Sequence, residues 1–203
     1  MIFNNYLTEQ EIVKELIKTS ELEDGFILNS YYNEETDTLL INEISYIKES
    51  APDIAAKKVY LGDKNNKRYI LIGGTDRVSH GGRMKISKKG HTSMPNNPTI
   101  TLKINKNDEI DIIGSLNDIN MSTKEFKKYK EFVRRNKNLI NLAKTEDLQY
   151  INDAVIKDAK LYHDGIDYER TKEGNLIIYE KDKDGNRIIK NIEDLKGRKI
   201  KND

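Results

Sequence analysis

The stretch ITLKINKNDEIDII, residues 100–113, decides the fold class, because it contains two short apolar strands joined by a polar turn. In its first half Ile100, Leu102 and Ile104 alternate with polar residues, which is the period-two pattern of a strand with one buried face. The tetrapeptide NKND supplies turn residues before the second strand, EIDII. The stretch therefore predicts an antiparallel β-hairpin.

Four more β-rich runs lie upstream of this hairpin. FILNSYY (26–32) and TLLINEISYI (38–47) flank the polar turn NEETD, and KKVYL (57–61) and KRYILI (67–72) flank GDKNN. Runs rich in branched and aromatic residues, separated by short polar linkers, are typical of consecutive hairpins. The first half of the chain is therefore expected to form a mostly antiparallel sheet.

Helical periodicity marks three other segments. A capping box at Thr8 precedes an apolar face at about 9–19, and two amphipathic helices are expected at about 123–144 and 146–163. The helix at 123–144 has basic residues over its polar face, and Thr145 is the expected cap of the helix at 146–163. A last hairpin, NLIIYE and NRIIK, precedes a polar tail. The predicted class is α+β, with one domain over 1–163 and the hairpin and tail over 164–203.

The composition limits the kinds of chemistry available. The chain has 203 residues, 36% of them hydrophobic and 34% charged, and contains no cysteine. Disulfides and every thiolate-based metal or nucleophile site are therefore excluded. No cofactor or metal motif is found, and no apolar run approaches the length of a membrane span. The start of the chain lacks the pattern of a signal peptide, so a cytoplasmic protein without a membrane partner is expected.

The overall charge of +1 conceals a strong asymmetry along the chain. Residues 1–63 carry 13 acidic and 5 basic residues, whereas 64–107 carry 1 acidic and 10 basic residues. A second basic zone, 124–144, has 8 basic and 2 acidic residues. Such asymmetry indicates a surface for a charged partner, although a charge run is by default a solvated face. The heavy use of isoleucine, lysine and asparagine is typical of low-GC bacterial genomes and their phages.

The first basic zone also contains a glycine-rich segment. Between residues 77 and 106 there are seven Lys or Arg and no Asp or Glu, and the sequence predicts a long loop over 73–98. It lacks the spacing of a nucleotide-binding glycine loop. One hypothesis is a mobile basic arm that contacts an anion, and the alternative is a surface loop without a ligand. The candidate binding residues are ten cations from the two zones, namely Arg77, Arg83, Lys85, Lys88, Lys89, Lys103, Lys127, Lys128, Arg134 and Arg135.

Two histidines, His80 and His91, flank the basic run and are the weak catalytic candidates. One could act as base and the other as acid in a metal-independent phosphodiester cleavage. No carboxylate after Asp76 is placed in the segment to orient either imidazole, and loop histidines are usually surface residues. The aspartate-rich turn 180–185 resembles the start of a calcium loop, but it lacks the final glutamate and reads as a hairpin turn.

Three functional hypotheses remain open from the sequence. The leading one is a non-enzymatic binding protein, of phage or mobile-element type, that engages nucleic acid or a nucleic-acid-handling protein complex in the manner of an inhibitor. The second is a small nuclease or phosphodiesterase centred on the two histidines. The third is a structural component whose charges serve only solubility. The oligomeric state is not indicated by any pattern.

Overall fold

The computed structural model describes residues 25–47, 67–73, 82–90 and 98–201. The elements follow one another as β1 (Gly25–Asn33), β2 (Thr38–Ile47), β3 (Lys67–Gly73), β4 (Arg83–Ser87), β5 (Thr99–Ile104), β6 (Ile110–Ile113), η2 (Asn117–Ile119), α2 (Thr123–Arg135), α3 (Lys137–Leu142), α4 (Leu148–His163), β7 (Tyr168–Arg170), β8 (Leu176–Lys181) and β9 (Arg187–Glu193). One antiparallel sheet has the order β2-β1-β3-β4-β5-β6, and a second has the order β7-β8-β9. The α+β prediction is confirmed.

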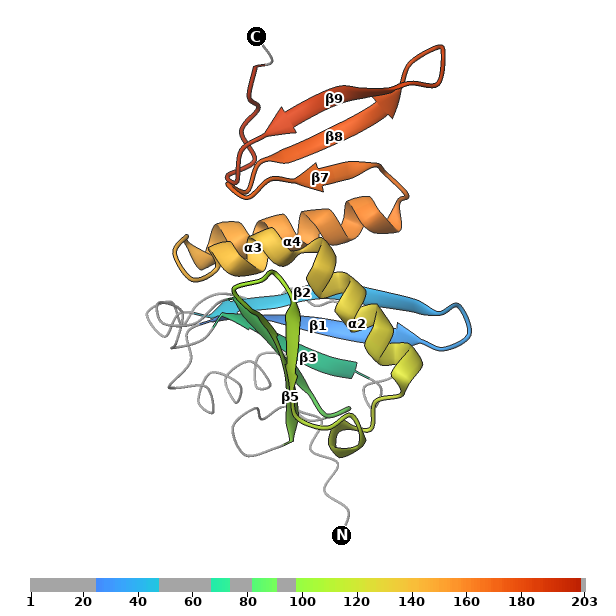
Figure 1. Ribbon diagram of the computed structural model, residues 1–203, viewed down its shortest axis with the longest axis vertical. Helices are drawn as coiled ribbons and strands as arrows, with labels where there is room; N and C mark the ends of the chain where they lie inside the picture. Colours follow the sequence, from blue (N-terminus) through green and yellow to red (C-terminus); the bar gives the residue numbers. More distant parts are fainter. Residues whose placement is uncertain (1–24, 48–66, 74–81, 91–97, 202–203) are drawn as a thin grey trace.

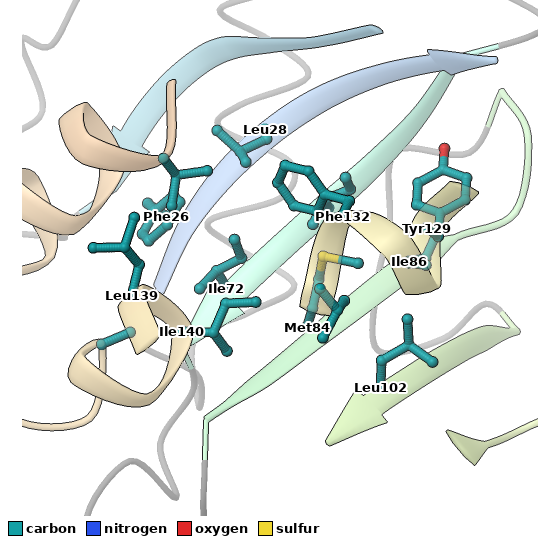
Figure 2. Packing of buried hydrophobic residues seen from close by; sticks show 14 of the residues in the cluster. Phe26, Leu28, Ile72, Met84, Ile86, Leu102, Tyr129, Phe132, Leu139 and Ile140 are labelled. Atoms are coloured by element: carbon teal, nitrogen blue, oxygen red, sulfur yellow. The ribbon is translucent and has the colours of Figure 1, made fainter. Parts of the chain in front are cut away.

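The helices lie on one face of the six-stranded sheet, and α4 runs between this sheet and the three-stranded one (Figure 1). The core forms where alternate strand residues meet α2 and α3. Figure 2 shows Leu28, Met84 and Leu102 of the sheet in one cluster with Phe132 and Leu139 of the helices, all of them fully buried. This packing follows from the period-two pattern of the strands and the period of 3.6 in the helices.

Most of the predicted strands are confirmed. The hairpin at 100–113 is β5 and β6, the runs 26–32 and 38–47 form β1 and β2, and KRYILI falls in β3. The C-terminal hairpin is β8 and β9, and β7 extends it to a three-stranded sheet that the sequence pattern did not predict. The expected helix at 9–19 and the run 57–61 lie outside the described residues.

The basic helix expected at 123–144 is two helices, which corrects the sequence prediction. The chain leaves helical geometry at Asn136, whose φ and ψ are −100° and 13°. The Asn136 side chain is buried, and its Nδ2 donates to the carbonyl oxygen of Phe132 at 2.9 Å. The backbone N–H of Asn136 donates to the same carbonyl at 3.0 Å, so the two donors share one acceptor where the helical geometry is interrupted. The predicted core positions Phe126, Tyr129 and Ile140 are nevertheless buried.

The next helix begins two residues later than the sequence suggested. Its N-cap is Asp147, whose carboxylate accepts a hydrogen bond from the backbone N–H of Gln149 at 2.9 Å, so the expected cap at Thr145 was wrong. Leu148 and Val155 are buried as predicted. Tyr162, expected to point inward, is 46% exposed, because it is in the last turn of α4.

The glycine-rich segment is not one continuous loop. Residues 83–87 form β4, which pairs with β3 on one side and β5 on the other. Met84 and Ile86 are fully buried in the core, so this part of the expected arm is a central strand of the sheet. The expected loop over 73–98 is therefore wrong for these residues.

Gly82 is required by close packing at the start of this strand. A Cβ atom there would lie 2.3 Å from the carbonyl oxygen of Ile140 and 2.7 Å from the backbone nitrogen of Asn141. We expect Gly82→Ala to lower the free energy of unfolding by about 1–3 kcal/mol, as overpacking does. Urea denaturation measures the change. Gly165→Ala is the control, since a Cβ at Gly165 meets nothing within 4 Å and only its φ of 69° opposes the change. A smaller effect at Gly82 than at Gly165 would contradict the packing argument.

Candidate polyanion-binding surface

Three of the residues singled out from the sequence lie outside the described part of the chain. Arg77 and His80 fall in the range 74–81, and His91 falls in the range 91–97. The two-histidine hypothesis therefore stays a prediction, as does the contribution of Arg77 to anion binding.

Three other predicted cations lie on the sheet face that is turned away from the helices. Arg83 of β4 is opposite Lys103 of β5, and Lys85 occupies the same face of β4. Their neighbour Met84 belongs to the core on the helix side. Arg83 is half-buried, and its Nε donates to the carbonyl oxygen of Gly73 at 3.2 Å. These cations do not join those of α2 in one surface.

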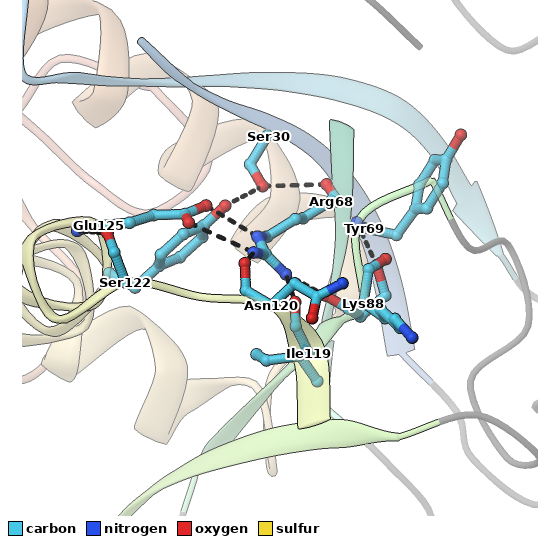
Figure 3. A network of polar contacts seen from close by, with 10 residues as sticks. Ser30, Arg68, Tyr69, Lys88, Ile119, Asn120, Ser122 and Glu125 are labelled. Carbon is cyan, nitrogen blue, oxygen red and sulfur yellow. Dashed lines mark hydrogen bonds and ion pairs between the residues drawn. The ribbon is translucent and has the colours of Figure 1, made fainter. Parts of the chain in front are cut away.

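A buried arginine organises the helix side of the sheet. Arg68 of β3 is fully buried, and its Nε and Nη2 donate to the two carboxylate oxygens of Glu125 at 2.7 and 3.2 Å (Figure 3). Its Nη1 donates to the carbonyl oxygens of Ser87 at 3.1 Å and Ile119 at 2.5 Å. Its Nη2 also donates to the carbonyl oxygen of Asn120 at 2.6 Å. All five guanidinium N–H groups therefore have an acceptor.

This arginine brings the two basic zones of the sequence together. It ties the end of β4, at Ser87, to the segment that leads into α2, and Figure 3 shows Lys88 beside Asn120. The turn that carries Lys88 and Lys89 therefore lies near the segment that leads from η2 into α2. Within the described residues, neither lysine forms an ion pair.

A second contact fixes the rotation of α2 on the sheet. The hydroxyl oxygen of Tyr129 lies 2.7 Å from Ser30 Oγ, and Ser30 Oγ donates to the backbone carbonyl of Arg68 at 2.9 Å. Because the Ser30 proton is used in this way, the tyrosine is the donor to Ser30. Complete burial raises the pKa of Tyr129, so its hydroxyl stays protonated. The opposite side of the helix is held toward solvent.

The outer face of α2 is strongly basic. Lys124, Lys127 and Arg134 are exposed at positions that share one side of the helix. Within the part of the chain that the structure describes, none of the three pairs with a carboxylate. Glu131 is the acidic residue on this side, and it already accepts a hydrogen bond from the Tyr162 hydroxyl. The outer face therefore presents unpaired positive charge at fixed positions.

The other two predicted cations of α2 lie on its flank. Lys128 Nζ is 3.4 Å from the carboxylate of Asp37, in the turn between β1 and β2. The guanidinium of Arg135 stacks on the ring of Tyr162, with its central carbon 3.3 Å from the ring centre. Both cations line a groove of about 710 Å³ between β2, α2 and α4.

Asp37 at the mouth of this groove is held in its charged form. The hydroxyl of Tyr32 donates to its carboxylate at 2.6 Å, and this hydrogen bond, followed by the charge of Lys128, lowers the pKa of Asp37. Desolvation and the same hydrogen bond raise the pKa of Tyr32 to about 12. Asp37 is therefore an acceptor whose negative charge is already matched.

Sequence reasoning missed the residues that position α2. Ser122 is its N-cap, and Ser122 Oγ accepts from the backbone N–H of Glu125 at 3.1 Å, so the S-x-x-E signature of a capping box was present in the sequence. Arg68 shares one strand face with Ile70 and Ile72, which was a signal that its side chain points into the core. The partner of the arginine could not be read from either pattern.

The described residues contain no group of three or more histidine, aspartate or glutamate side chains arranged to hold a metal ion. In the same ranges, no helix combines the length and the apolar character needed to cross a lipid bilayer. Comparison with known proteins finds no matching family model, no matching curated protein and no matching solved structure. The residues themselves therefore carry the functional argument.

Proposed function

We propose that the protein is a non-enzymatic binding protein that engages the phosphate backbone of a nucleic acid, either free or within a nucleoprotein complex. The outer face of α2 and the turn at Lys88 and Lys89 form the binding surface. The observation that carries the proposal is the row of exposed cations Lys124, Lys127 and Arg134, none of which pairs with a carboxylate of the described chain. A cytoplasmic location is part of the same proposal.

The rigidity of the surface supports this proposal. The buried bonds of Glu125 and Tyr129 fix α2 on the sheet, so the backbone positions from which its cations project are set without a ligand. Phosphate contacts position a protein on a nucleic acid without reading its sequence. We therefore expect binding that is strongly dependent on salt and weakly dependent on sequence.

Binding of a fluorescent DNA duplex of about 20 base pairs, followed by anisotropy between about 50 and 200 mM salt, tests the proposal. Loss of three phosphate contacts lowers the steepness of the plot of log K against log salt by about 2.7. We expect this change in the triple variant Lys124→Gln, Lys127→Gln and Arg134→Gln.

The matched control removes the same charge elsewhere. The variant Lys172→Gln, Lys181→Gln and Lys183→Gln neutralises three exposed lysines of the C-terminal sheet and should bind as the unchanged protein does. Equal weakening by both triple variants would show that net charge alone drives association, and binding that ignores salt would reject a phosphate contact. A protein partner captured from cell extract that survives nuclease treatment and needs the α2 cations would assign the surface to an acidic protein and would reject the contact with a nucleic-acid backbone.

A further inference from the structure

The groove beside α2 runs along β2, the edge strand of the large sheet as the described residues form it. β2 is the terminal strand in the sheet order, and within the described residues it pairs with β1 alone. One wall of the groove is formed by five consecutive residues, 37–41, in and just before this strand. Successive strand side chains point to opposite faces, so a wall of consecutive residues means that the groove follows the backbone edge.

The opposite wall is one face of α4. Ile156, Ala159, Lys160 and His163 line the groove, and their spacing of three, four and seven residues places them on the same side of the helix. The floor is the flank of α2, which includes Phe132. A channel between an edge strand and a helix has the form of sites that bind an extended peptide as an added strand.

The edge of β2 supplies backbone groups for such pairing. In an edge strand every second residue directs its N–H and C=O groups away from the sheet, where a further strand can meet them. The side chains of an added strand would alternate between the two faces of the sheet. Every second side chain would therefore point toward α2 and α4.

The groove has more cations than carboxylates to match them. Lys128, Arg135 and Lys160 line it with two carboxylates, of which Asp37 pairs with Lys128 and Glu131 accepts a hydrogen bond from the neutral Tyr162 hydroxyl. Lys160 and His163 are exposed and make no ion pair within the described chain. Arg135 also has no carboxylate partner there, and its guanidinium lines the groove where it stacks on Tyr162.

We propose that this groove binds an extended acidic segment of a partner protein, which adds to β2 as a further strand and directs its carboxylates toward Arg135, Lys160 and His163. Charge complementarity selects the segment, and backbone pairing holds it. The site adjoins the outer face of α2 at Glu131 but includes none of Lys124, Lys127 and Arg134, so failure of either proposal leaves the other standing.

A fluorescent, end-blocked peptide of alternating glutamate and valine, about seven residues long, is the probe. We expect this peptide to bind saturably to the full-length protein. The matching peptide of alternating lysine and valine should bind about tenfold more weakly or worse. The double variant Lys160→Glu and His163→Glu should weaken the acidic peptide by about tenfold or more. Lys172→Glu, a charge reversal outside the groove, should leave its affinity unchanged. Equal weakening by the control would overturn the proposal.

Two N-methylated versions of the peptide distinguish strand addition from charge attraction alone. One carries methyl groups on the backbone nitrogens of the glutamates and the other on those of the valines. Because only alternate residues of an added strand pair with β2, one version should lose about tenfold or more in affinity and the other should bind nearly as the parent does. Equal affinities for the two versions would reject pairing with the edge of β2. Binding that survives the groove variants but is lost with those on the outer face of α2 would assign the peptide to that face.

Discussion

Replacing Arg68 by methionine is expected to lower the free energy of unfolding by about 3–5 kcal/mol, because it leaves Glu125 buried without its cation. The side chains of Arg68 and Glu125 are 0% and 3% exposed, so water cannot take over the lost bonds. The carbonyl oxygens of Ser87, Ile119 and Asn120 lose their shared donor as well. Urea denaturation followed by circular dichroism measures the change.

A double-mutant cycle shows whether the pair is the cause. We expect the variant Arg68→Met and Glu125→Leu to be less destabilised than the sum of its two single variants, since no buried charge remains. Arg187→Met is the matched control, because Arg187 pairs with Asp167 at 2.6 Å where the side chains are 45% and 56% exposed. Exposed pairs contribute about 1 kcal/mol or less. Similar losses at Arg68 and Arg187 would contradict the assigned role of burial.

Local patterns were sufficient for most elements but could not reveal their partners. The period-two alternation of β5 and the helical period of α2 follow from which residues must be buried, and both were readable from the sequence. The bond between Arg68 and Glu125 joins residues 57 positions apart, and no local pattern records such a distance. The capping sequence from Ser122 to Glu125 was readable, but the bond from Arg68 of β3 to the Glu125 carboxylate was not.

Composition was misleading for the glycine-rich segment. Its charge and glycine content favoured a loop, whereas Met84 and Ile86 alternate with polar residues and are buried between β3 and β5. Neighbouring strands on both sides stabilise β4 despite the flanking glycines, so tertiary pairing outweighs local propensity. Gly82 is needed for contact with α3 and not for mobility.

The two proposed surfaces differ in how far the sequence could predict them. The cations on the outer face of α2 are a property of the helix alone, and the sequence identified Lys127 and Arg134. The groove exists only because β2 is the edge strand and α4 runs beside it, which depends on the order of the strands in space. Lys160 and His163 were therefore not recognised as neighbours of Arg135.

Replacing Arg170 by methionine is the second substitution for which we expect a loss of about 3–5 kcal/mol near neutral pH. Arg170 of β7 donates to the carboxylate of Asp158 in α4 through Nη2 at 2.5 Å and Nε at 3.1 Å, and the two side chains are 4% and 0% exposed. Its Nη1 donates to the carbonyl oxygen of Gly174 at 2.8 Å. The pair therefore attaches the C-terminal sheet to the rest of the fold, and hydrogen exchange should rise most in β7 to β9.

The loss should depend on pH because Asp158 is titratable. Burial raises the pKa of Asp158, although the hydrogen bond and charge of Arg170 oppose the shift. When the pKa of a carboxyl is higher in the folded protein than in the unfolded chain, the protonated carboxyl favours the folded state. This contribution to the free energy of unfolding is complete below the unfolded pKa and is lost as the pH rises through the folded pKa. Without Arg170 the folded pKa rises further, so the deficit of Arg170→Met should shrink as the pH falls from neutral toward the ordinary aspartate value of about 3.9.

Urea denaturation of the protein and the variant at about pH 8 and about pH 5 tests this dependence. The control is the double variant Asp158→Asn and Arg170→Met, which has no titrating carboxyl at this position. Its stability difference from Asp158→Asn alone should be nearly the same at the two pH values, because neither of these proteins can protonate residue 158. A deficit of Arg170→Met that is equally large at both pH values would mean that Asp158 keeps its charge without the arginine, and it would contradict the burial of an unpaired carboxylate as the origin of the loss.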